Sequence, residues 1–150
     1  MTNPNPLQKY FRQPAIYIRL PSDGRYWPQG TLEMPANREL AVYPMTAMDE
    51  ITNRTADGLF NGESVVKVIQ SCIPGIKDAW YIPSVDLDTV LVSIRIASYG
   101  HEMEFESKCS HCGEDNNFAL DLRAVLEQIV MPNYEETVKY GDLEIYFQPL

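Results

Sequence analysis

The sequence lacks the residues and motifs on which most enzymes and membrane proteins depend. Its only histidines are His101 and His111, and neither has a GxSxG or HExxH motif beside it. The GxGxxG and GxxxxGKS/T signatures of dinucleotide and triphosphate binding are also missing. No apolar run approaches the roughly 18 residues that a membrane helix needs, and the opening MTNPNPLQKYFRQP lacks the apolar centre of a signal peptide. We therefore expect a soluble protein without catalytic activity or a membrane partner, which stays in the cytosol of the cell that makes it.

Basic residues are scarce, and the scarcity is confined to the second half of the chain. The net charge is -9, and residues 76–150 hold 14 acidic against 5 basic side chains, whereas residues 1–75 hold 7 of each. Affinity for nucleic acid comes from Lys and Arg that neutralise phosphates. The acidic half therefore disfavours a nucleic-acid partner, and its charge favours solubility.

Cysteine is scarce as well, and its number excludes a disulfide framework. The three cysteines are an odd count in a chain without a secretory signal. Cys72 lies within VVKVIQSCI, where we expect a small buried hydrophobic residue. Cys109 and Cys112 form CSHCG, and two thiolates at this spacing can hold one edge of a tetrahedral zinc ion. This pair is the chain's one recognisable chemical motif.

A complete zinc site needs four ligands, and the sequence has no second CxxC and no HxxxH. The further ligands available are His111, His101, Cys72 or an acidic side chain such as Asp115, and a second copy of the chain is another source. Two other interpretations stay open. The motif can be a tight turn with free thiols, or a redox pair, although a thioredoxin-like CxxC opens a helix and CSHCG lies between predicted strands.

The length of 150 residues suits one α+β domain. Short stretches bounded by prolines predict antiparallel strands at 15–20, 31–34 and 39–43. Thr46 is a suitable N-cap for a helix that ends near Arg54. A second helix is expected from residue 63 or 64 to the Pro-Gly pair at 74–75, because its apolar residues recur at spacings of three and four.

The stretch after Pro83 fits both a strand and a helix by periodicity. Its length, the polar residues from Ser84 onward and a glycine at Gly100, where a left-handed C-terminal cap belongs, favour a mostly buried helix with Arg95 paired or extended to solvent. Beyond it, alternating residues predict a hairpin of 101–108 and 116–122 with the CxxC knuckle at its tip. A short helix capped by Asp121 and a final hairpin turning at Gly141-Asp142 complete the prediction.

These elements suggest an N-terminal arm at 1–14, a core of short strands and helices at 15–100, and a knuckle hairpin, short helix and final hairpin at 101–150 within the same globular unit. Exposed aromatic side chains beside cations or proline-rich turns are typical of protein interfaces. We expect the partner-binding residues to be Tyr10, Phe11, Arg12, Trp27, Trp80 and Tyr81.

Several blocks of sequence follow one another in an order that resembles a known family. They are KYFRQPAIYIRLPSDGRYWPQG, LAVYPMTAMDE, VIQSCIPGIKDAWYIPSVDLDTVLVSIRIASYG, and CSHCG with its acidic turn. Across this succession, from about Lys9 to Leu150, the chain resembles the baseplate hub subunit and hub assembly proteins of T4-type tailed bacteriophages.

The resemblance implies a structural or assembly protein of the baseplate hub, which acts through protein–protein contacts while the contractile tail is built. Its partners would be other hub and tail proteins or further copies of itself, first in the infected bacterial cytoplasm and then in the virion tail. The resemblance transfers no catalytic residue. It also implies a longer chain, so this one is either a short member or lacks a C-terminal helical part. A zinc-knuckle module with a regulatory role remains the alternative.

Overall fold

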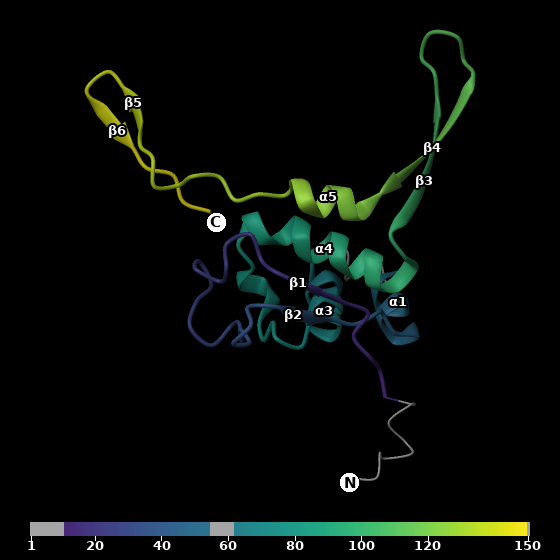
Figure 1. Ribbon diagram of the computed structural model, residues 1–150, viewed down its shortest axis with the longest axis horizontal. Helices are drawn as coiled ribbons and strands as arrows, with labels where there is room; N and C mark the ends of the chain where they lie inside the picture. The colour runs from purple at the N-terminus through teal and green to yellow at the C-terminus, as the bar shows by residue number, and fades with distance from the viewer. Residues whose placement is uncertain (1–10, 55–61, 150) are drawn as a thin grey trace.

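Two helices packed against a two-stranded sheet form the core of the protein. The computed structural model describes residues 11–54 and 62–149. Within them, α3 (Glu63–Cys72) and α4 (Ser84–Tyr99) contact each other, and α4 also contacts the strands β1 (Ile16–Ile18) and β2 (Leu40–Val42). Two hairpins project away from this core on the same side (Figure 1). The mixture of helices and short antiparallel strand pairs confirms the predicted α+β class.

The N-terminal sheet has two strands, not the three that the sequence predicted. β1 and β2 are antiparallel, with Ile16 opposite Val42. The predicted strand at 31–34 instead makes an isolated bridge between Leu32 and Ile76. The Glu33 N–H also donates to Gly75 O at 2.7 Å, so this segment pairs with the chain that follows α3 and not with β1 or β2.

The helix α1 (Ala47–Asn53) begins as predicted, at a capping box. The Thr46 hydroxyl accepts from the Asp49 N–H, and the Asp49 carboxylate accepts from the Thr46 N–H at 2.8 Å. Two of the amides that a helix start leaves unpaired are thereby satisfied. The cap fixes α1 beside α3.

The helix α3 buries the face predicted from its three-and-four spacing, including Val68, Ile69 and Cys72. After it, the 3₁₀ turn η2 (Ala79–Tyr81) starts at Asp78, whose carboxylate accepts from the Trp80 N–H at 3.1 Å. Gly75 lies where the chain passes closest to β2, since a Cβ there would stand 2.8 Å from a Leu40 methyl.

The segment after Pro83 is a helix, as length and termini predicted. α4 buries Val90 and Ile94 against the core and ends at Gly100, which has a φ of 86° and an extended ψ of 173°. Arg95 is paired, because it donates to Gly100 O at 3.2 Å and its guanidinium lies 4.8 Å from the centre of the Tyr99 ring. No helix among the described residues is long and apolar enough to span a membrane.

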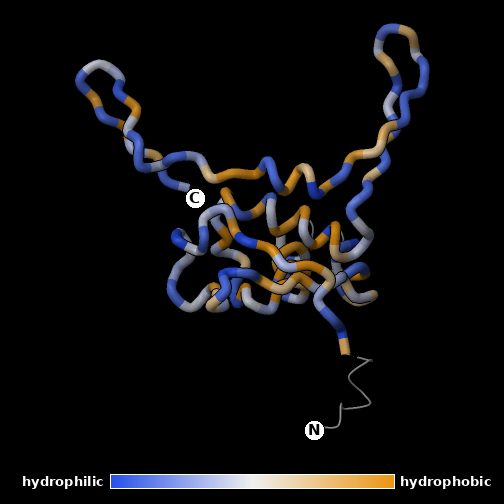
Figure 2. The backbone as a smooth tube through the Cα atoms, viewed as in Figure 1, coloured by the Kyte–Doolittle hydropathy of each residue, from blue (hydrophilic) through white to orange (hydrophobic). Residues whose placement is uncertain are grey.

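The last third of the chain forms the two projecting hairpins and the helix between them. The first arm consists of β3 (Glu102–Lys108) and β4 (Asp115–Asp121), and the second arm of β5 (Val138–Tyr140) and β6 (Leu143–Ile145). Between them α5 (Leu122–Gln128) rests on α4. The first arm leads directly into this helix, and an extended segment, residues 129–137, connects the helix to the second arm (Figure 1). Hydropathy alternates along both arms (Figure 2).

Candidate interaction surface

The first arm carries apolar side chains on one of its faces. In the β3–β4 register, Met103 lies opposite Leu120 and Phe105 opposite Phe118, and alternate residues of a strand share a face. The Phe105 and Phe118 rings are stacked, with their centres 6.1 Å apart. We call these four residues the first apolar strip.

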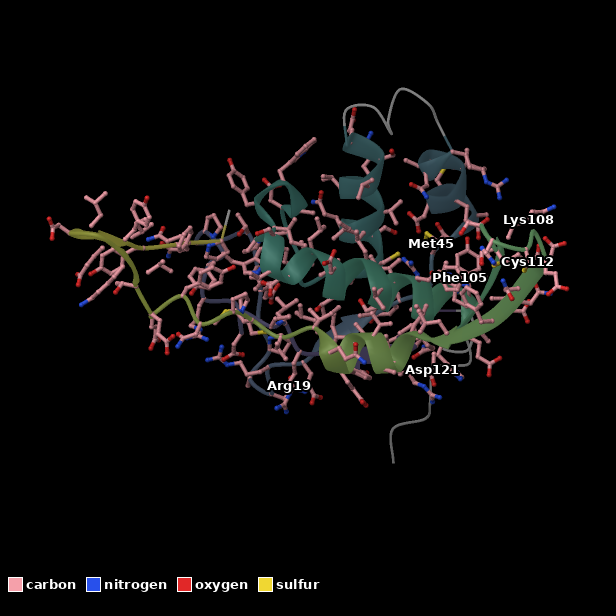
Figure 3. All side chains as sticks on the ribbon, turned by 90° about the horizontal axis from the view of Figure 1, so that it is seen from above. Arg19, Met45, Phe105, Lys108, Cys112 and Asp121 are labelled. Carbon is pink, nitrogen blue, oxygen red and sulfur yellow. The ribbon has the colours of Figure 1, made fainter. Side chains whose placement is uncertain are left out.

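The opposite face of the same arm is acidic. It carries Glu102, Glu104 and Glu106, which alternate with the apolar residues along β3. The arm stands away from the core, and its labelled residues Phe105, Lys108 and Cys112 lie along it toward the tip (Figure 3). The surface is thus divided into an apolar side and a negatively charged side.

The second arm also has an apolar face, but its other face carries both charges. Val138 lies opposite Ile145 and Tyr140 opposite Leu143, which places these four residues on one face, the second apolar strip. On the other face Lys139 and Glu144 form an ion pair at 3.4 Å. The sequence predicted this hairpin and its Gly141-Asp142 turn, but did not identify its apolar face as a candidate contact surface. The alternation on both sides of the turn indicates an apolar face, but does not show whether that face is covered.

The second strip is exposed throughout, and in the first strip Phe118 and Leu120 are exposed while Met103 and Phe105 are partly buried. The side chain of Phe118 is 53% exposed, that of Tyr140 76% and that of Leu143 64%. An isolated two-stranded hairpin is marginally stable in water, because one of its faces has nothing to pack against. Contiguous exposed apolar groups on a projecting element typically mark protein–protein contact sites. The two strips are therefore the strongest interaction candidates in the described chain.

Contacts on either side of α5 join its start to the first arm and the segment after it to the turn at 21–28. Asp121 caps α5 by accepting from the Arg123 N–H, and hydrogen bonds from Arg123 lower the pKa of this carboxyl to about 2. The Leu122 N–H donates to His101 O at 2.8 Å, which ties the helix start to the base of β3. Beyond the helix, the Tyr134 ring stands edge-on to Tyr26 of the core at 6.1 Å.

The tip of the first arm holds CSHCG. The Gly113 N–H donates to Cys109 O and the Cys109 N–H to Glu114 O, each at 2.9 Å, so the loop is a tight turn. Hydrogen bonds to the Cys109 sulfur from the backbone amides of Cys112 and His111, and from the Cys112 thiol, lower the pKa of the Cys109 thiol. Cys112 is exposed and Cys109 partly so.

The further metal ligands considered from the sequence do not gather at this tip. Cys72 is fully buried in the core, where burial raises the pKa of its thiol. His101 lies at the base of β3, seven strand residues from the tip, which is about 20 Å at the rise of a strand. In the part of the chain that the structure describes, no three His, Cys, Asp or Glu side chains, His111 and Asp115 included, are grouped for a metal ion.

The predicted contact residues fall into three groups. Phe11, Trp80 and Tyr81 are more than half exposed and stay candidates for partner contacts. Tyr10 lies outside the described residues. Arg12 and Trp27 are both engaged within the chain.

Arg12 fastens the N-terminal segment to the helices. Its guanidinium donates to Ser71 O at 2.9 Å and to Pro44 O, and lies 3.6 Å from the Asp49 carboxylate. Burial acts to raise the pKa of Asp49, but hydrogen bonds from Thr46 and Ser71 and the charge of Arg12 outweigh it and lower that pKa. Arg12 therefore acts as an internal anchor, which its place in a proline-rich segment did not indicate.

Trp27 lies in the core and not on a contact surface, which corrects the prediction for it. Its side chain is 9% exposed, and its indole N–H donates to the Asp86 carboxylate at 2.8 Å. Asp86, in the first turn of α4, is fully buried and also accepts from Ser22 N–H at 2.9 Å and from the Ser22 hydroxyl at 2.5 Å. This cluster ties the turn at 21–28 to the start of α4. Buried carboxylates are rare, so nothing in the sequence pattern indicated one here.

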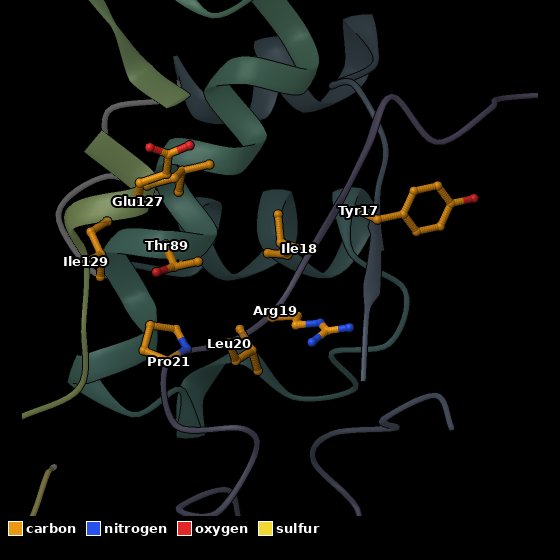
Figure 4. A pocket seen from close by; sticks show the side chains of 9 residues that line it. Tyr17, Ile18, Arg19, Leu20, Pro21, Thr89, Glu127 and Ile129 are labelled. Carbon is orange, nitrogen blue, oxygen red and sulfur yellow. The ribbon is translucent and has the colours of Figure 1, made fainter. Parts of the chain in front are cut away.

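A groove of about 360 Å³ runs between β1 and α5 (Figure 4). Pro21, Thr89 and Ile129 line it, and Tyr17 projects away from them. The Thr89 hydroxyl is buried there without a hydrogen-bond partner among the described residues. Arg19, which follows β1, forms an ion pair with Glu39 at 3.2 Å. The groove therefore lies where α5 and the residues after it border the core.

Comparison with known proteins identifies the family. The family model described as T4 bacteriophage base plate protein matches residues 31–149, which is most of the chain and includes both arms. Searches among curated proteins and among solved structures found no match. The chain therefore belongs to the T4 bacteriophage base plate protein family, which indicates a structural protein of the phage baseplate that interacts with other baseplate proteins.

Proposed function

We propose that this member of the T4 bacteriophage base plate protein family is a baseplate hub protein that joins other hub and tail proteins through its two arms as the contractile tail is built. The observation that carries the proposal is the pair of exposed apolar strips on hairpins that stand clear of the core. Burying such strips would contribute about 25 cal/mol for each square ångström removed from water.

The acidic back of the first arm adds specificity to this proposal. Residues 102–121 carry six acidic side chains and one lysine. A partner that covers the first apolar strip would therefore bind most selectively if its contact surface had an apolar centre and basic side chains at its rim, because charge complementarity disfavours wrong partners. We infer that the protein acts first in the infected bacterial cytoplasm and then in the tail baseplate, alone or as several copies.

Co-purification tests the role of the arms. The tagged chain is expressed with the other baseplate proteins of its phage, as wild type and with Tyr140→Ser combined with Leu143→Ser. Truncating interface anchors costs more than about 1 kcal/mol each, so we expect recovery of a partner to fall about tenfold or more. Met48→Gln is the matched control, because Met48 is 69% exposed on α1, away from both arms.

Equal recovery with the arm variant and with Met48→Gln would contradict the proposal. Phe11, Trp80 and Tyr81 would then be the next contacts to substitute. A mass-spectrometric inventory of purified virions and of assembly intermediates separates the two finer roles. We expect the chain in hub intermediates, and its presence or loss in virions decides between a subunit and an assembly factor.

A further inference from the structure

We propose that Cys109 and Cys112 form half of a zinc site that two copies of this chain complete, tip to tip, with four thiolates. Each copy supplies two adjacent thiols on a tight, exposed turn. Structural zinc is almost always tetrahedral, with four protein ligands, and a set of four cysteine thiolates is one of its usual ligand sets. This inference goes beyond the proposed function and does not depend on the identity of the partner proteins.

The backbone holds the two cysteines together on one tight turn. The Gly113 N–H donates to Cys109 O and the Cys109 N–H donates to Glu114 O, each at 2.9 Å. Gly113 adopts a φ of 75° with open space around it, and this conformation allows its N–H to close the turn onto Cys109 O. These backbone bonds and the glycine after the second cysteine fix the turn that carries both thiols.

One copy alone cannot complete the site. Cys72 is buried in the core and His101 stands at the far end of β3, so neither reaches the tip. The Glu114 carboxylate lies 4.0 Å from the Cys112 sulfur, and the described residues offer no third grouped ligand. The arm's projection leaves the turn accessible, and a two-fold pair presents the same two thiols from each side.

Charge explains why the metal is required for this contact. Glu114 and Asp115 follow the thiols, and Lys108 is paired with Asp115 at 3.7 Å. Two such acidic tips repel each other without a cation between them. A zinc ion displaces four thiol protons to solvent and bridges the tips through four Zn–S bonds, which offset this repulsion although the centre of four thiolates and zinc itself keeps a net negative charge. The pair of chains should therefore form with zinc and separate without it.

The experiment is native mass spectrometry of the full chain, purified under reducing conditions, with and without added zinc and with a chelator. We expect one zinc ion for every two chains, a doubled mass, and return to the single-chain mass on chelation. Cys112→Ser should lose both the zinc and the pairing. Cys72→Ser, which removes a thiol of the core, should keep both if it folds, and circular dichroism checks the folding of each variant.

Several results would overturn the inference. One zinc ion on a single chain would show that His111 or a carboxylate completes the site within one copy. Absence of zinc binding by the folded wild type, or pairing that survives chelation, would also refute it. Cobalt substitution gives an independent readout, because the absorption of a site with four thiolates differs from that of a site with two. None of these outcomes decides whether the arms bind other baseplate proteins.

Discussion

The buried carboxylate of Asp86 gives the sharpest test of how the core is held together. Asp86→Ala leaves the Ser22 N–H and the Trp27 indole N–H without acceptors in a dry site. Each buried donor left unsatisfied costs about 1–3 kcal/mol, so the variant should lose about 4 kcal/mol of its free energy of unfolding. For a chain of this length, that loss lowers the melting temperature by about 10 °C.

Two further variants separate the hydrogen bonds from the packing. Asp86→Asn keeps the side-chain volume but replaces one acceptor oxygen with an NH2 group, which would face a donor of Ser22 or Trp27. We expect the free energy of unfolding to fall by about 1–3 kcal/mol. Trp27→Phe removes the indole N–H together with its requirement for an acceptor. Combined with Asp86→Ala it should therefore cost less than the sum of the two single changes, by about 1 kcal/mol.

The assay is urea unfolding followed by far-ultraviolet circular dichroism. Asp88→Asn is the matched control, because Asp88 is exposed and lies two residues further along the same helix start. A surface change of this kind is expected to stay within about 0.5 kcal/mol. If Asp86→Ala and Asp88→Asn were equally stable, the cluster around Asp86 would not anchor the turn at 21–28, and the reasoning would fail.

Two further predictions concern the rest of the core. Because the pKa of Asp49 is lowered on folding, its contribution is present above the unfolded value of 3.8 and is lost as the pH falls through the folded pKa. Unfolding across a pH series should show Asp49→Asn less stable than wild type near neutral pH and this difference shrinking below about pH 4; a difference independent of pH would contradict it. Gly75→Ala would place a Cβ 2.8 Å from a Leu40 methyl and 3.1 Å from Glu33 O. It should cost about 1–3 kcal/mol in denaturant unfolding, and a neutral result would mean that the strand and the turn separate freely.

Sequence patterns predicted the elements that local signals define. Thr46 with Asp49 marked the start of α1, and Gly141-Asp142 placed the last turn. α4 was recognised by its length and ends, although its apolar residues surround much of the helix and support no single period. Such signals lie within a few residues of one another, so the sequence alone carries them.

Features that depend on distant partners escaped prediction. The segment at Leu32 was expected to pair with its neighbours in sequence, but its partner is Ile76. Trp27 resembled an interface anchor because its acceptor, Asp86, is 59 residues away. For the candidate surface, the sequence indicated the knuckle at Cys109 and Cys112. It did not indicate the apolar strips, because the pattern of an exposed hairpin equals that of one packed on a core.

The presence of both arms on one chain has a consequence for assembly. The first arm leads into α5, and residues 129–137 connect α5 to the second arm, so a single chain offers both strips together. When both contacts form, the second occurs at an effective concentration of about 1 mM, so two contacts of about 10 μM each would combine to about 0.1 μM. A half-built neighbour that presents a single site would be held about a hundredfold less tightly and released, whereas a complete one would be retained. Through this avidity the protein would bind completed assemblies in preference to incomplete ones.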